Sequence, residues 1–92
     1  MTPKIGDTVY CIYRNCIIKQ EVGYIGKDSF IVDNFTDDVF FDSLEWFYED
    51  YGTHWFTNFD DAADKLLEWT RMCHNDAKII AIDEDIWEVA YD

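Results

Sequence analysis

Short runs of β-branched and aromatic residues, separated by turn-forming residues, fill the first third of the chain. Thr8 to Tyr13, Cys16 to Ile25 and Ser29 to Val32 each have this character. The polar and glycine-containing residues between the runs are typical of tight turns. The pattern therefore predicts three short strands in succession.

The second run carries the most specific expectations. We expect Ile17, Val22 and Tyr24 to point into the core, because they are large apolar residues of a predicted strand. Gly23 lies within this run and favours a bend or a bulge, since glycine weakens a regular strand interior.

The clearest helical pattern runs from about residue 59 to residue 72. Apolar or small residues recur there at helical spacing and form one stripe: Phe59, Ala62, Ala63, Leu66, Leu67 and Thr70. We expect Thr57 and Asp60 to act as a capping pair at the start. Asp60, Asp61 and Asp64 suit the first turns because the helix dipole stabilises negative charge there, and this explanation needs no binding partner.

The remaining segments complete an α+β order. Val39 to Phe41 reads as a short strand, whereas Leu44 to Tyr51 fits either a strand or a helical turn. Ile79 to Ile82 and Ile86 to Tyr91 read as closing strands. We therefore predict one domain over residues 1–92, α+β in class, with a small curved antiparallel sheet or a small barrel and one amphipathic helix.

The composition limits the partners of this chain. Its 92 residues carry a net charge of −13, with 20 acidic residues against 7 basic ones. Nucleic-acid phosphates and anionic membranes repel such a chain, so we expect no direct binding to nucleic acid and none to membranes. No stretch reaches the roughly 18 apolar residues of a membrane helix, and the start MTPKIGD lacks the apolar part of a secretion signal. We therefore expect a cytoplasmic protein.

The negative charge and the aromatic residues are concentrated in the same segment. Residues 28–64 hold eleven acidic residues, no Lys or Arg, and eleven of the seventeen aromatic residues. A domain this small cannot bury all of those aromatic side chains. An acidic surface with exposed aromatic residues is typical of a protein-binding face. The alternative is that the aromatic residues fill the core and the acids keep the protein soluble.

Motifs for catalysis or cofactor binding are absent from the sequence. There is no glycine-rich phosphate loop, no nucleophile elbow and no metal-binding helix motif. The spacing of Cys11, Cys16, Cys73 and His74 is poor for zinc. Positions 11 and 16 face opposite sides of a strand, and adjacent residues rarely ligate one metal together. We expect no cofactor, no metal and no enzymatic activity.

Two stretches resemble known proteins. KIGDTVYCIY resembles the first strand of many SH3-like barrels. YGTHWFTNFDDAADKLLEW resembles the tail of short proteins carried by phages and mobile elements of Firmicutes bacteria, at the positions Tyr51, Gly52, Phe56, Thr57, Asp61, Ala62 and Leu66. In size and acidity the chain is also similar to phage anti-defence proteins, including anti-CRISPR inhibitors that imitate DNA. These resemblances imply an SH3-like core and a protein that acts in the cytoplasm of a bacterial host.

We therefore expect a non-enzymatic inhibitor of phage type. Its partner would be a host nuclease or another nucleic-acid-binding protein, whose basic groove it would occlude as a nucleic-acid mimic or a steric block. Alternate carboxylates on a strand lie about 6.5 to 7 Å apart, which is similar to the spacing of successive phosphates. The expected contacts are Asp33, Asp37, Asp38, Asp42, Glu45, Glu49 and Asp50, with Trp46, Tyr48 and Tyr51 as aromatic anchors.

A second hypothesis remains open beside the first. The chain would then be an acidic protein-interaction or self-assembly module with no inhibitory role, in one form a homo-oligomer joined through its aromatic surface. Its acidity would serve solubility. A sizing column separates the two hypotheses, because a stable oligomer with its aromatic residues buried would favour the module. Salt tests the mimicry in the first hypothesis, because a complex based on charge weakens steeply as salt is added.

Overall fold

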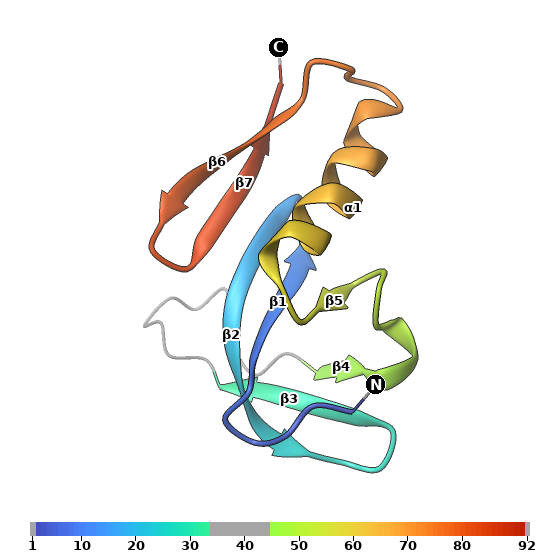
Figure 1. Ribbon diagram of the computed structural model, residues 1–92, viewed down its shortest axis with the longest axis vertical. Coiled ribbons are helices and arrows are strands. Elements are labelled where there is room, and N and C mark those ends of the chain that lie inside the picture. Colours follow the sequence, from blue (N-terminus) through green and yellow to red (C-terminus); the bar gives the residue numbers. More distant parts are fainter. Residues whose placement is uncertain (1, 34–44, 92) are drawn as a thin grey trace.

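The computed structural model of the protein describes residues 2–33 and 45–91, which form a curled antiparallel sheet and an α-helix (Figure 1). The elements in chain order are β1 (Thr8–Tyr13), β2 (Cys16–Ile25), β3 (Ser29–Asp33), β4 (Glu45–Phe47), the 3-10 helix η2 (Tyr48–Asp50), β5 (Trp55–Phe56), α1 (Phe59–Arg71), β6 (Lys78–Asp83) and β7 (Ile86–Ala90). The predicted α+β class is confirmed, and the curled sheet forms a half-barrel.

The long strand β2 holds the sheet together. One of its edges pairs with β1 over the whole length of β1. The other edge is divided, because β7 pairs with residues 16–18 and β3 pairs with residues 21–25. The sheet continues from β3 to β4, from β1 to β5, and from β7 to β6. As a result β6 and β7 form a hairpin beside the half-barrel (Figure 1).

A β-bulge in β2 explains one wrong prediction. Ile17 and Val22 are buried as predicted, but Tyr24 is 60% exposed. The register against β3 shifts between Val22 and Tyr24, so Gly23 marks the irregularity that its position predicted. The extra residue reverses the alternation of faces along the strand. Tyr24 therefore points away from the core, whereas Ile25 packs against it.

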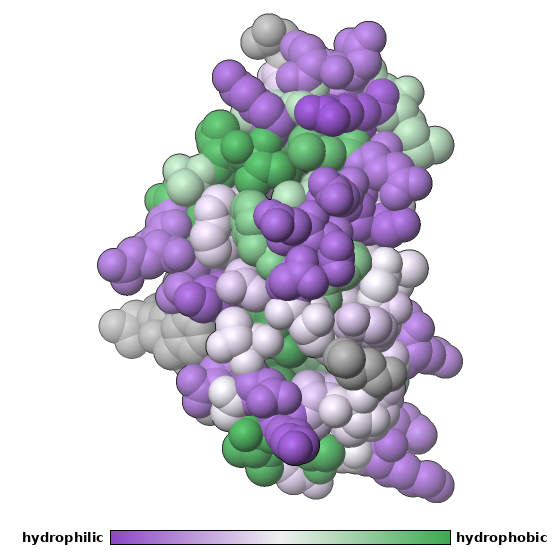
Figure 2. All heavy atoms as spheres, in the orientation of Figure 1, coloured by the Kyte–Doolittle hydropathy of each residue, from purple (hydrophilic) through white to green (hydrophobic). Residues whose placement is uncertain are grey.

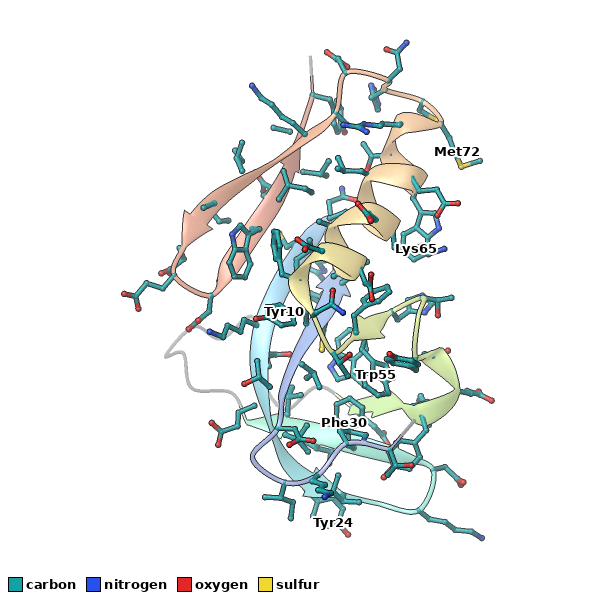
Figure 3. The ribbon with its side chains drawn as sticks, viewed as in Figure 1. Tyr10, Tyr24, Phe30, Trp55, Lys65 and Met72 are labelled. Atoms are coloured by element: carbon teal, nitrogen blue, oxygen red, sulfur yellow. The ribbon has the colours of Figure 1, made fainter. Side chains whose placement is uncertain are left out.

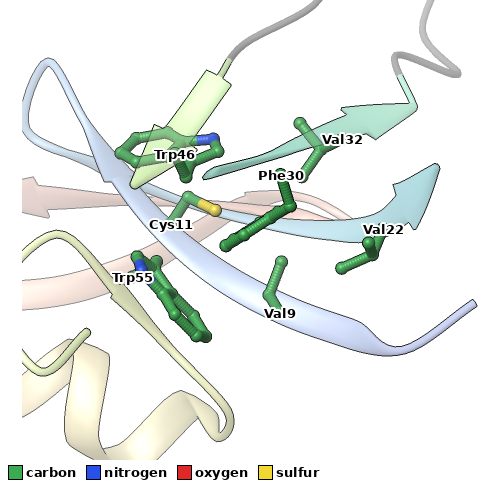
Figure 4. Close-up of a cluster of buried hydrophobic side chains, with 7 residues drawn as sticks. All are labelled: Val9, Cys11, Val22, Phe30, Val32, Trp46 and Trp55. Atoms are coloured by element: carbon green, nitrogen blue, oxygen red, sulfur yellow. The ribbon is translucent and has the colours of Figure 1, made fainter. Parts of the chain in front are cut away.

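The first of two hydrophobic clusters fills the half-barrel (Figure 4). Its buried members are Val9, Cys11, Val22, Phe30, Val32, Trp46 and Trp55. The rings of Phe30 and Trp55 meet edge to face with their centroids 4.8 Å apart. The indole Nε1 of Trp55 also donates to the carbonyl oxygen of Phe47 at 2.8 Å. The strand order runs from β4 through β3, β2 and β1 to β5. This hydrogen bond therefore connects the two end strands of that order, β4 and β5.

The second cluster lies between α1, the opposite face of β1 and the β6–β7 hairpin. Its buried members are Ile12, Ile17, Phe56, Ala62, Leu66, Ala77 and Val89. Ala62 and Leu66 belong to the predicted apolar stripe of the helix, and Phe59, Ala63 and Leu67 pack beside them. Because Ile12 belongs to this cluster and Val9 and Cys11 to the first, β1 is buried on both of its faces.

The helix begins as predicted at Phe59, but with a different cap. Asn58, not Thr57, is the N-cap residue, and its side-chain oxygen accepts the backbone N–H of Asp61 at 2.9 Å. Its amide nitrogen donates to the Asp61 carboxylate, also at 2.9 Å. The capping pair therefore has the predicted spacing of three residues but starts one residue later.

The other boundaries lie close to those expected from the sequence. The helix ends at Arg71, and the predicted strands β3, β6 and β7 each agree to within one residue at either end. The ambiguous segment from Leu44 to Tyr51 contains both alternatives, because the short strand β4 is followed directly by η2. The strand expected over Val39 to Phe41 lies outside the described residues.

Candidate functional site

The acidic residues Glu49 and Asp50 lie on η2, directly before a tight turn. The carbonyl oxygen of Asp50 accepts backbone N–H groups from Thr53 at 3.1 Å and from His54 at 2.9 Å. Gly52 within this turn has a φ of +89°, a conformation that glycine adopts without steric strain. The turn is therefore fixed by backbone hydrogen bonds and places Tyr51 and Gly52 opposite α1.

The polar side of α1 faces this turn. Asp61, Asp64 and Glu68 follow one another at intervals of three and four residues, which places them along one side of the helix. Lys65 lies among them, and its Nζ is 3.1 Å from Oε2 of Glu68. Lys65 projects from α1 on the side of the turn around β5 (Figure 3).

A shallow groove separates the turn from the helix. Its volume is about 340 Å³, and it is lined by Tyr51, Gly52, Phe56, Asp61, Asp64, Lys65 and Glu68. Three carboxylates and one ammonium group line this groove, so it favours a cationic ligand. We call these seven residues the acidic groove.

Two aromatic rings are exposed around the acidic groove. The ring of Tyr51, which lines the groove, is tilted against that of Trp55 at 4.8 Å, and Tyr51 stays 38% exposed. Trp69 follows Glu68 on α1 and is 39% exposed. Its ring lies 5.8 Å from that of His54, whose Nδ1 is 4.0 Å from the carboxylate of Asp50. Both rings offer apolar contact area beside carboxylates, a combination that suits a protein-binding surface.

Two of the three predicted aromatic anchors pack in the interior of the fold. Trp46 is 8% exposed and belongs to the first cluster, so its prediction as a surface anchor is wrong. Tyr48 is half-buried, with its ring stacked on Phe30 at 6.2 Å and its hydroxyl donating to the Gly26 carbonyl at 2.6 Å. The small half-barrel needs both rings to fill its interior. Of the three, Tyr51 keeps an exposed ring at the acidic groove.

Within the described residues, the predicted acidic contacts do not form one row on a strand. Glu45 is exposed on β4, where its carboxylate accepts the hydroxyl of Ser29. Glu49 and Asp50 lie on η2 instead of a strand, so the spacing of strand carboxylates does not apply to them. Asp33 is the last residue of β3, where it pairs with Glu21. The remaining predicted contacts, Asp37, Asp38 and Asp42, lie outside the described residues.

The sequence did not predict four residues of this surface as partner contacts. They are Asp61, Asp64, Glu68 and Trp69, all on α1. The helix dipole already accounts for acids in the first turns, so their charge alone gave no reason to place a partner there. A signal does exist, because Asp61, Asp64 and Glu68 repeat at helical spacing on the side away from the apolar stripe.

The cysteines and histidines occupy separate places. Burial raises the pKa of the Cys11 thiol far above its ordinary value of 9.0. Burial, followed by the negative charge of Glu88, also raises the pKa of Cys16, while Cys73 is exposed. The His74 ring stacks on that of Tyr91 at 3.7 Å. Within residues 2–33 and 45–91, no three Cys, His, Asp or Glu side chains are grouped so as to hold a metal ion.

The described part of the chain also contains no helix with the length and hydropathy needed to cross a membrane. Comparisons of the chain with protein-family models, with curated proteins and with solved structures found no match.

Proposed function

We propose that this protein binds another protein through the acidic groove and the two exposed rings beside it, without performing chemistry. The partner presents a basic surface, as the groove of a nuclease or another nucleic-acid-binding protein does. Occupying that surface would inhibit the partner by steric and electrostatic occlusion. This is the inhibitor of phage type that the resemblance implies, with the contact surface moved largely onto α1.

The observation that carries this proposal is the convergence of two elements on one groove. Asp61, Asp64 and Glu68 come from α1, whereas Tyr51 comes from the turn after η2. Carboxylates steer a basic partner and fix its register, and an aromatic ring at the same place supplies apolar contact area. Lys65 is the cation in the groove lining, and its ion pair with Glu68 leaves Asp64 to face an incoming guanidinium or ammonium group.

A capture experiment with matched variants tests the proposal. The double variant Asp64→Asn with Glu68→Gln removes two charges from the groove, and Glu21→Gln with Asp28→Asn removes two from exposed positions that do not line it. Each tagged protein is immobilised, exposed to bacterial lysate at low salt, and washed with duplex DNA or with salt. The bound proteins are identified by mass spectrometry.

We expect the wild type and the control variant to retain a nucleic-acid-binding protein that duplex DNA and salt both displace. The groove variant should retain about tenfold less of it, because it loses the Asp64 carboxylate and leaves the Lys65 charge uncompensated beside a basic partner, effects of about 0.5 to 1 kcal/mol each. Equal retention by the groove variant, or retention unaffected by DNA and salt, would contradict the proposal.

A further inference from the structure

The strand β6 forms an edge of the sheet and has one neighbour, β7, among the described residues. Its sequence, KIIAID, is apolar except at its two ends and contains no proline. Ile80 is 38% exposed and Ile82 is 52% exposed. The space-filling view shows hydrophobic surface gathered over the C-terminal hairpin, in the upper left (Figure 2). An apolar edge strand of this kind is a template for pairing with a further strand.

The pairing pattern shows which backbone groups of β6 point outward. The backbone N–H of Val89 bonds to the carbonyl oxygen of Asn15, so the N–H and C=O groups of Val89 point toward β2. Successive residues of a strand alternate in this respect, so the N–H and C=O groups of Glu88 point toward β6. Glu88 lies opposite Ile80, so the N–H and C=O groups of Ile80 point toward β7. By the same alternation Ile79 and Ala81 direct their N–H and C=O groups away from the sheet.

At each end of β6, a structural feature limits how far the outer edge can pair with another strand. At the start of β6, the carbonyl oxygen of Ala77 accepts two hydrogen bonds from the Arg71 side chain, at 2.9 and 3.1 Å. At the other end, the register against β7 shifts between Ala81 and Asp83. The open part of the edge is therefore short and is centred on Ile80.

The charges at the two ends of β6 are self-complementary. Lys78 begins the strand, and the acidic turn Asp83-Glu84-Asp85 follows its end. In an antiparallel pair of two identical strands, the start of each strand lies beside the end of the other. Each Lys78 would then lie beside the acidic turn of the second strand, while the isoleucines meet in the middle.

We propose that the outer edge of β6 binds β6 of a second copy of this chain, in antiparallel orientation about a two-fold axis through Ile80. Ile79 of one copy then lies opposite Ala81 of the other, so that the outward N–H and C=O groups bond to each other. The sheet becomes continuous across the dimer. This assembly uses a different surface from the aromatic one expected in the sequence analysis.

The dimer leaves the acidic groove open. In Figure 1, β6 lies on the far side of β2 and β7 from η2 and β5. Two copies therefore present two acidic grooves, and a partner with two basic surfaces gains affinity from bivalent binding. The pairing itself does not depend on the proposed function. The net charge of −13 on each copy opposes association, so salt strengthens this dimer, whereas salt weakens binding at the groove.

Sedimentation velocity over a range of protein concentrations tests the pairing. Ala81→Pro removes an outward N–H and blocks the edge, whereas Ala81→Ser retains the N–H. Lys78→Glu places like charges together in the dimer. Lys27→Glu, in the exposed turn between β2 and β3, changes the net charge equally but lies away from β6. Circular dichroism establishes that each variant is folded.

We expect the wild type, Ala81→Ser and Lys27→Glu to form dimers that tighten with salt. Ala81→Pro and Lys78→Glu should each weaken the dimer by about tenfold or more. A monomeric wild type at about 0.5 mM and high salt would overturn the proposal, as would dimers that Ala81→Pro and Lys78→Glu leave unchanged. If Ala81→Pro does not fold, the comparison of Lys78→Glu with Lys27→Glu decides between the outcomes.

Discussion

The thiol of Cys11 is expected to make the stability of this fold fall at alkaline pH. Cys11 is fully buried in the first cluster, and its pKa in the folded protein lies far above its ordinary value of 9.0. Ionisation is therefore confined to the unfolded chain, which loses its proton as the pH rises past 9.0. Because the pKa is raised on folding, the stabilisation is fully present below the ordinary pKa and declines above it.

The size of this loss in the free energy of unfolding follows from the ionisation of the Cys11 thiol in the unfolded chain alone. Between about pH 7 and about pH 10, ionisation of one thiol in the unfolded state lowers the free energy of unfolding by about 1.4 kcal/mol. Cys11→Ala removes this contribution, at the expense of about 1 to 2 kcal/mol of packing that does not depend on pH. The free-energy difference between wild type and Cys11→Ala should therefore shrink by about 1.4 kcal/mol over that range.

Urea unfolding followed by tryptophan fluorescence, with a reducing agent present, measures this difference. Other groups that titrate in the same range are common to both proteins and cancel in the comparison. Cys73→Ala is the matched control, because Cys73 is exposed. A difference between wild type and Cys11→Ala that stays constant from about pH 7 to about pH 10 would contradict this prediction, since the thiol would then ionise equally in both states.

Three further predictions concern stability, each measured by thermal or urea unfolding. Asn58→Ala should lower the free energy of unfolding by about 1 kcal/mol, because the N–H of Asp61 loses its cap, whereas Asn58→Ser should stay close to wild type. Tyr48→Phe should lower it by about 1 kcal/mol through loss of the bond to the Gly26 carbonyl, and an equal loss from Tyr24→Phe, at an exposed ring, would argue against that cause. Raising the salt concentration from about 20 mM to about 500 mM should raise the melting temperature, because it screens the repulsion within a chain of net charge −13, and a fall would contradict this.

Local patterns predicted most elements of the fold. The apolar stripe of α1 and the runs of β1 and β2 are local signals, so their ends could be predicted to within a residue. The pairing of β2 with both β3 and β7 at one edge depends on contacts between distant segments, which no local pattern encodes. Tyr24 shows the same limit at the level of one residue, because Gly23 predicted a bulge but not the reversal of faces that follows from it.

The candidate site was predicted in part. The predicted contacts and the acidic groove share Tyr51, and composition alone does not separate aromatic residues that fill a core from those that stay exposed. Trp46 and Tyr51 differ by five positions in the chain, but Trp46 belongs to the first cluster and is 8% exposed, whereas Tyr51 follows η2 and is 38% exposed. The contribution of α1 was missed because Asp64 and Glu68 belong to the groove only once the helix packs beside the turn after η2.

The divided edge of β2 has a consequence for how the molecule opens. The hairpin of β6 and β7 is attached to β2 at residues 16–18 and shares the second cluster with α1, whereas β3 and β4 enclose the first cluster. We therefore expect two cooperative units that meet along β1 and β2. Opening of either unit leaves the hydrogen bonds between these two strands in place. Amide protons of β1 and β2 that bond across this pair should exchange with solvent the most slowly, and their exchange should report the unfolding of the whole domain.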